Sequence, residues 1–196
     1  MSSTDQCNVR DNQGTARYLI HVAPRGALVT NRPELMRRLR DLGIHVINIR
    51  IGSNHIEVDA LSRNIGADAD IIDKAIGSVT RIIPLNEENE VEDPFKAFIE
   101  LFNEERFWEA HEVLEGVWRA NRDTRVQGLI VLAVAFAKLQ EESPTGFQRL
   151  MQRSLDLMAG SHQVDCISID RIRELINEAI RSRRPFRIHC KNNELD

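Results

Sequence analysis

A short acidic stretch divides this chain into two parts whose hydrophobic periods differ, and each period permits only certain kinds of secondary structure. The stretch, residues 86–93, reads Asn-Glu-Glu-Asn-Glu-Val-Glu-Asp and holds a single apolar residue. Before it, apolar residues alternate with polar ones in several segments, whereas after it they recur with the period of an α-helix. We therefore expect two domains joined by an acidic linker over residues 87–93.

The first part of the chain shows the order of elements that is typical of a ferredoxin-like α+β domain. Strands are expected over residues 17–22, 44–51, 55–60 and 80–85, and helices over residues 31–42 and 67–78. Asn31 and Asp68 are the expected N-caps of the two helices. The order β-α-β-β-α-β predicts an antiparallel four-stranded sheet with both helices on one face. We assign this domain to residues 17–86, after a polar stretch over residues 1–16 that we expect to be disordered.

The second part of the chain predicts an all-α helical bundle over residues 94–182. About five helices are expected, over residues 95–102, 103–120, 124–140, 144–160 and 168–182. Asn103 is the expected N-cap of the second helix. The third helix is apolar on most faces, which is typical of a central helix. Residues 183–196 follow as a basic tail, in which Pro185 prevents further helix.

The composition excludes several classes of protein. The formal net charge is −4, so no global positive field attracts nucleic acid. Residues 1–86 carry 11 basic and 9 acidic side chains, whereas the remainder carries 15 and 21, and this uneven charge also favours two domains. The longest apolar run, residues 129–137, is too short to span a membrane, and no apolar leader follows Met1. We therefore expect a cytoplasmic protein.

The cysteines do not predict a fold stabilised by disulfides or by zinc. There are three of them, Cys7, Cys166 and Cys190, and no Cys-x-x-Cys pair is present. An odd number at these spacings indicates neither a disulfide framework nor a zinc knuckle.

The most distinctive segment is residues 102–118, which holds one histidine, five carboxylates and both tryptophans of the protein. If this segment is helical, its apolar stripe consists of Phe107, Ala110, Val113, Leu114, Val117 and Trp118. His111 then lies just past the Trp118 edge of the stripe, and Glu115 lies one turn further on the same side. Glu109 lies beyond the opposite edge.

Two interpretations of His111 and Glu115 stay open. In the functional one they form an acid/base or metal-binding pair, because a carboxylate beside an imidazole raises the pKa of the imidazole and fixes its tautomer. In the structural one, which we favour, His111 packs between helices, and Glu109 and Glu115 pair with Arg or Lys. The zinc-protease pattern His-Glu-x-x-His lacks its second histidine here, and two ligands do not make a metal site. We therefore expect no metal or other cofactor, and His111 and Glu115 are the candidate ligands if one binds.

Three blocks of sequence carry a resemblance to a known family. The first consists of Phe-Asn at residues 102–103, Phe-Trp-Glu-Ala-His-Glu at 107–112, Leu-Glu at 114–115 and Trp118; the second is Gln-Gly-Leu-Ile at 127–130, and the third is Pro-Thr-Gly at 144–146. On these blocks, residues 94–180 resemble an uncharacterised prokaryotic helical family, domain of unknown function 309. The resemblance implies an all-α fold without an established activity.

The resemblance also implies a polar pocket on the second helix of the bundle. Two positions depart from the family pattern: Glu105 stands where glycine is favoured, and Lys138 stands where similar members often carry a second histidine. The lysine implies an ion pair with Glu109 or Glu115 in place of a metal. The candidate binding residues are therefore Glu109, His111, Glu115, Trp118, Gln127 and Lys138.

Two further patterns are weaker. His21, His45 and His55 lie on three predicted strands, which suggests a histidine cluster, but the strand register that would test it is not visible in sequence. Tyr18 is the only aromatic residue on the predicted strands, so the sheet lacks the stacking platform of an RNA-binding domain. The arginines near residues 181–187 are more typical of a solvated helix end than of a phosphate site.

These observations predict a non-catalytic ligand-binding or interaction protein with a polar pocket near His111. Its N-terminal domain would sense an effector or mediate dimerisation, by analogy from the fold alone. The alternative is a hydrolase that uses His111 as a general base oriented by Glu115, with or without a divalent metal. Nucleic-acid binding through the arginine-rich C-terminus is the weakest alternative. A small-molecule ligand and a homo-oligomer are compatible with the sequence, whereas a membrane is not.

Overall fold

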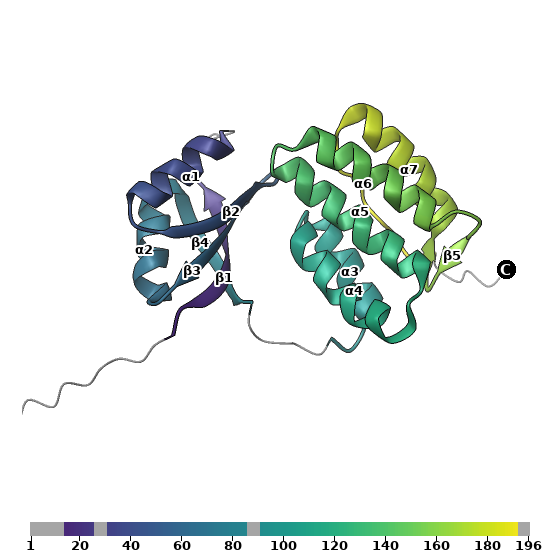
Figure 1. Cartoon of the computed structure of the whole chain (residues 1–196), viewed down its shortest axis with the longest axis horizontal. Coiled ribbons are helices and arrows are strands. Elements are labelled where there is room, and N and C mark those ends of the chain that lie inside the picture. Colours follow the sequence, from purple (N-terminus) through teal and green to yellow (C-terminus); the bar gives the residue numbers. More distant parts are fainter. Residues whose placement is uncertain (1–13, 26–30, 86–90, 192–196) are drawn as a thin grey trace, which may run out of the picture.

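The structure, a computed structural model, describes residues 14–25, 31–85 and 91–191. The α+β domain and the helical domain that follows it both have the predicted fold class (Figure 1). The predicted disorder of the N-terminus and most of the predicted linker fall outside the described residues. None of the helices within these ranges is both long enough and apolar enough to cross a bilayer.

The N-terminal domain is an antiparallel four-stranded sheet with two helices. Its elements are β1 (Ala16–Pro24), α1 (Arg32–Asp41), β2 (His45–Ile51), β3 (Ile56–Ser62), α2 (Ile65–Ile76) and β4 (Gly77–Pro84). The strand order is β2-β3-β1-β4, as expected for a ferredoxin-like sheet. Apolar residues of α1 and α2 pack with Ile20, Val22 and Val58 into one core on one face of the sheet. The opposite face lies toward the helical domain (Figure 1).

The two helices of this domain begin at asparagine caps. Asn31 accepts a hydrogen bond from the backbone N–H of Glu34 at 3.0 Å, which confirms the predicted cap of α1. The prediction of Asp68 as the cap of α2 was wrong, because Asn64 already accepts from the N–H of Ala67 at 3.2 Å. Asp68 lies in the first turn instead, where its charge complements the helix dipole.

The C-terminal domain consists of five helices, one of which is central. They are α3 (Pro94–Asn103), α4 (Phe107–Asn121), α5 (Thr124–Gln140), α6 (Pro144–Leu157) and α7 (Ile169–Ser182). As predicted, α5 is central. Ten of its residues are buried, and it packs against α4 and α6. The phenylalanines Phe102, Phe107, Phe136 and Phe186 form an aromatic cluster in this core.

The turn between α3 and α4 differs from its prediction. Asn103 does not cap α4, because Glu104, Glu105 and Arg106 separate the two helices and Arg106 is the N-cap residue. Glu105 has a φ of 60°, a left-handed conformation that glycine adopts most easily. A glycine, which we expected at this position from the resemblance, would adopt this conformation without strain.

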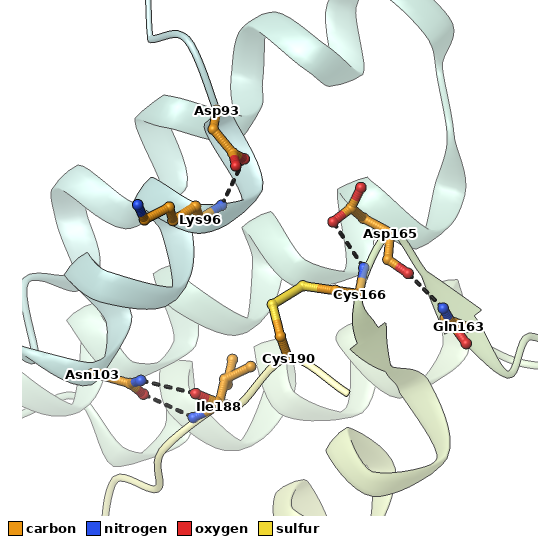
Figure 2. The surroundings of a disulfide bond; sticks show 8 residues. All are labelled: Asp93, Lys96, Asn103, Gln163, Asp165, Cys166, Ile188 and Cys190. Atoms are coloured by element: carbon orange, nitrogen blue, oxygen red, sulfur yellow. Dashed lines mark hydrogen bonds between the residues drawn. A yellow bond between two sulfur atoms is a disulfide. The ribbon is translucent and has the colours of Figure 1, made fainter. Parts of the chain in front are cut away.

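The chain after α6 returns to the helical domain through a structure that the sequence did not predict. A small hairpin of β5 (Gln163–Val164) and β6 (Ile167–Ser168) precedes α7, and residues 183–191 run back beside it. Cys166 of the hairpin forms a disulfide with Cys190, so the expectation of no disulfide was wrong (Figure 2). The two cysteines are 24 residues apart, and only the return of the chain after α7 brings them together.

Candidate metal centre between the domains

The face of the sheet that lies away from α1 and α2 carries charged side chains, yet most of them are buried. His21 pairs across the strands with Glu57, which in turn lies opposite Arg50. Glu57 and Asp59 are fully buried, and Arg50 is 1% exposed. Charges on an uncovered sheet would be solvated, so this burial comes from the helical domain that covers them. Burying charge in this way is unfavourable unless each group is paired, which makes the face a candidate functional site.

Arginines compensate part of the buried negative charge. Arg17 donates two hydrogen bonds to Asp59, at 2.8 and 2.6 Å, and the pKa of Arg17 is raised by this pairing. Arg50 lies 3.4 Å from Glu57 and 3.2 Å from Glu141 of the helical domain. Its guanidinium also stacks 4.1 Å from the ring centre of Trp108 on α4. Arg50 is therefore held by groups of both domains.

Direct hydrogen bonds join the two domains around this face. Asn48 donates to Glu141 at 2.6 Å. At the tip of the β2–β3 hairpin, Ser53 donates from its backbone N–H and from its hydroxyl to Glu105, at 2.8 and 2.7 Å. The loop before α4 thus holds the hairpin at a defined position.

Two histidines and a glutamate meet at the centre of the interface. The ring of His21 on β1 lies 5.7 Å from the ring of His55, the residue before β3, and Glu57 on β3 is the cross-strand partner of His21. One ligand atom from each of His21, His55 and Glu57 lies within 4.8 Å of the other two. Histidine and carboxylate ligands at this spacing are the donors that divalent transition metals prefer.

The facing atoms of His55 and Glu57 are unusual because neither has a hydrogen-bond partner among the described residues. His55 Nε2 and Glu57 Oε1 are both buried and lie 3.5 Å apart. The other ring nitrogen of His55, Nδ1, lies 3.0 Å from Asn54 Oδ1, an atom that can only accept. In neutral His55 this nitrogen carries the proton, so Nε2 presents a lone pair to a carboxylate oxygen. Two facing lone pairs require either a proton or a cation between them.

The helical domain contributes Glu109 to the same cluster. Glu109 Oε1 lies 2.8 Å from His21 Nε2, and Arg106 donates to both oxygens of Glu109 at 2.9 and 2.5 Å. Burial by itself raises the pKa of Glu109, but the hydrogen bonds from His21 and Arg106 outweigh it and lower the pKa to about 2. Glu109 is therefore an anion at neutral pH, positioned against the histidine pair.

The structure separates most of the other residues that the sequence singled out. His111 is half-buried, its Nδ1 is hydrogen-bonded to the carbonyl of Trp108, and burial lowers its pKa to about 4. Glu115 Oε2 forms an ion pair with Arg119 Nε at 3.9 Å, and the structure shows no hydrogen bond between His111 and Glu115.

The remaining candidates also have partners of their own. Lys138 donates to Glu141 at 2.5 Å, not to Glu109 or Glu115 as we expected. Trp118 lies under the guanidinium of Arg122, at 4.5 Å. Gln127 is half-buried in the first turn of α5, where its backbone N–H donates to Asp123. Of the predicted pocket residues, Glu109 alone lies in the histidine cluster.

Sequence analysis missed His55 and Glu57 as partners of His21, although one signal for them was present. The three strand histidines suggested a cluster, and the register now shows that His21 and His55 meet whereas His45 does not. His45 is exposed and lies opposite Leu61, four positions along β3 from Glu57. The two charged residues of β3, Glu57 and Asp59, stand in an otherwise apolar strand, and this was the second available signal.

The comparisons with known proteins concern the helical domain. Residues 95–150 match the model of a family described as a domain of unknown function (DUF309). No curated protein and no solved structure matches the chain significantly. The matched residues run from α3 into α6 and include Glu109, but not the strands that carry His21 and His55. The resemblance seen in the sequence is thereby confirmed over residues 95–150, which match a domain of unknown function, DUF309.

Proposed function

We propose that this protein is a non-catalytic metal-binding protein whose site lies between its two domains. A divalent transition-metal ion is held by His21, His55 and Glu57 of the sheet. Glu109 of α4 becomes the fourth ligand when the ion displaces the hydrogen bond between His21 Nε2 and Glu109, with the proton of that nitrogen moving to Nδ1. The observation that carries the proposal is the pair of buried, facing atoms His55 Nε2 and Glu57 Oε1, 3.5 Å apart and without hydrogen-bond partners among the described residues. This departs from our expectation that no cofactor binds.

The spacing of these two atoms fits a shared metal ion. Zn²⁺ binds histidine nitrogen and carboxylate oxygen at about 2.0–2.2 Å. If two such bonds meet at the ion at a tetrahedral angle, these bond lengths place the two ligand atoms roughly 3.4 Å apart. The distance between His55 Nε2 and Glu57 Oε1 agrees with this value, whereas it is too long for a good hydrogen bond.

The charges and the number of ligands also favour a closed site. Glu57 and Glu109 supply two negative charges, which match a divalent cation, and the two imidazoles are neutral donors. Imidazole and carboxylate together suit Zn²⁺ and its neighbours in the first transition row. Because all four tetrahedral positions are taken by protein side chains, the ion has no open position for substrate, as in structural zinc sites. The proposed role is therefore binding and not catalysis.

The hydrolase alternative has less support. The pKa of His111 is about 4, which makes the imidazole a weak base, whereas a general base works best with a pKa near the operating pH. In addition, Glu115, the proposed orienting residue, pairs with Arg119, and the Nδ1 atom of His111 is engaged by the Trp108 carbonyl. The metal site has more support, because its unpartnered atoms already face one another.

Titration with Zn²⁺ and Co²⁺ tests the proposed function. Purified protein, first treated with a chelator, should bind one Zn²⁺ per chain by calorimetry, and Co²⁺ should give the intense visible absorption of tetrahedral coordination. His55→Ala should weaken binding at least tenfold, because it removes one of four ligands. His45→Ala is the matched control, since His45 is an exposed strand histidine away from the cluster. Equal affinity in the two variants, both shown to be folded by circular dichroism, would refute the site.

A further inference from the structure

A cavity lies in the helical domain between α7 and the returning C-terminal segment, away from the proposed metal centre. It has a volume of about 610 Å³, within the range of small-molecule sites. Its lining consists of Ile167, Ser168, Arg171, Ile172, Leu175, Arg187, Ile188, His189, Cys190 and Lys191. We refer to this cavity as the α7 groove.

The floor of the α7 groove is apolar. Ile167, Ile172 and Ile188 belong to the core of the helical domain and are at most 2% exposed, and Leu175 extends the same surface outward. A ligand that lies on this floor gains by removing apolar surface from water. Sugars and inorganic phosphate have no such surface to offer.

The rim of the α7 groove is cationic. Arg171, Arg187 and Lys191 line it, and no Asp or Glu is among the lining residues. Arg171 forms an exposed ion pair with Glu174 at 2.7 Å, which is a weak interaction in water. Within the described ranges, Arg187 and Lys191 take part in no ion pair. This concentration of positive charge contrasts with the acidic balance of the whole chain.

The wall formed by the C-terminal segment is held in place at several points (Figure 2). The disulfide joins Cys190 to Cys166, and the backbone N–H of Lys191 donates to the carbonyl of Cys166 at 2.8 Å. Further up the segment, the Asn103 side chain both donates to and accepts from the backbone of Ile188, at 2.8 Å in each case. The groove is therefore preorganised, which lowers the entropic cost of binding.

We propose that the α7 groove binds a small amphiphilic carboxylate, such as an aliphatic acid of medium length. The hydrocarbon chain lies on Ile172, Ile188 and Leu175, and the carboxylate lies at the rim, where the planar guanidinium of Arg187 can bind both of its oxygens. This site is independent of the proposed metal centre, since the two share no residue.

Octanoate and 1-octanol are the probes that test this proposal, because they differ only in the head group. Octanoate binding, followed by NMR chemical shifts of the full chain, should be at least fivefold tighter than octanol binding. Added salt should weaken the binding of octanoate but not that of octanol. Equal affinity for the two probes would show that the cations do not recognise the ligand and would overturn the proposal.

Two protein-side comparisons complete the experiment. Arg187→Gln should weaken octanoate binding at least fivefold, whereas Arg184→Gln should leave it unchanged, because Arg184 is also an exposed arginine of the same segment but does not line the groove. Reduction of the disulfide with dithiothreitol should also weaken binding, since it frees one wall. Identical behaviour of the two arginine variants, both with the circular dichroism spectrum of the unaltered chain, would contradict the assignment.

Discussion

Glu109 is a buried carboxylate that stays ionised, although burial disfavours its charged form. Its surroundings exclude most water, which by itself favours the protonated form, but Arg106 and His21 both bind the anion. The balance of these effects lowers the pKa, so the carboxylate is a fixed negative charge at the domain interface. Arg106 lies three residues before Glu109, but His21 comes from the other domain, so the sequence does not predict this balance.

The lowered pKa of Glu109 predicts a specific pH dependence of stability. A carboxyl whose pKa is lower in the folded state stabilises the fold above its unfolded pKa of about 4.3, and this contribution is lost as the pH falls toward the folded value of about 2. In the presence of a chelator, Glu109→Gln should therefore be less stable than the unaltered chain at pH 7, by on the order of 2 kcal/mol. The difference should shrink between pH 4.5 and pH 2 in urea denaturation. A difference that is constant over this range would contradict the assigned pKa.

At the scale of elements, the β2–β3 hairpin positions His55, and the C-terminal segment forms one wall of the α7 groove. The hairpin brings His55 against Gly52, where an added Cβ would lie 2.7 Å from the imidazole Cε1. The C-terminal segment is attached to α3 through Asn103, which lies 85 residues away from Ile188 in sequence. The position of His55 therefore depends on the absence of a side chain at Gly52. The position of the C-terminal segment depends on a contact between residues that are distant in sequence.

The contact at Gly52 predicts that a single methyl group displaces His55. Gly52→Ala should lower the free energy of unfolding by about 1–3 kcal/mol through overpacking and should weaken Zn²⁺ binding. Gly116→Ala is the matched control, since no heavy atom lies within 4 Å of the added Cβ in the middle of α4. That substitution should stabilise the protein by about 0.5–1 kcal/mol, because alanine is the better helix former. Thermal and urea denaturation measure both effects, and similar destabilisation by the two changes would contradict the contact.

The hydrogen bonds of Asn103 predict that it anchors the C-terminal segment. Asn103→Ala leaves the backbone N–H and carbonyl of Ile188 without this partner, so it should destabilise the protein by about 1–3 kcal/mol. Asn177→Ala is the comparison, because Asn177 is exposed and donates only to the carbonyl of Arg173 in its own helix. Urea denaturation distinguishes the two variants, and the anchoring role fails if their stabilities match.

At the scale of the whole molecule, the domains share a charged interface in place of an apolar one. His21 and Glu109, Asn48 and Glu141, and Ser53 and Glu105 join them by direct hydrogen bonds. Interfaces of this polar kind usually permit relative motion of domains. A metal ion with ligands from both domains would reduce that motion, because the domains could then separate only by breaking a metal–ligand bond.

This arrangement predicts that metal binding couples the two domains. In hydrogen–deuterium exchange, Zn²⁺ should slow exchange both in the β2–β3 hairpin and at the N-terminal end of α4. In Glu109→Gln the hairpin should still be protected, because three ligands remain on the sheet, whereas α4 should not. If α4 is protected equally in both proteins, Glu109 is not a ligand, although the three-residue site on the sheet would still stand.

Local sequence rules predicted the elements better than they predicted the site. The bounds of α5, residues 124–140, agree because a long apolar run with a cap at Asp123 determines them within one segment. The cap of α2 was placed wrongly because Asn64, four residues before Asp68, takes that role. The cap of α4 was placed wrongly because the Asn103 side chain binds the backbone of Ile188 instead. The His21–His55 pair could be suspected but not assigned, since a strand register shift of one residue would send either ring to the opposite face.

The order of strands and helices and the resemblance of residues 95–150 to DUF309 follow from patterns within short segments, where hydrophobic period and capping residues act over a few turns. The burial of Glu57 and Asp59, the meeting of His21 with His55 and Glu109, and the Cys166–Cys190 disulfide were decided only by the tertiary structure. Each of these joins segments that lie far apart along the chain, and the energy of such a contact depends on what covers it. The same carboxylate is an ordinary solvated charge on an open sheet and a candidate metal ligand once the helical domain excludes water from it.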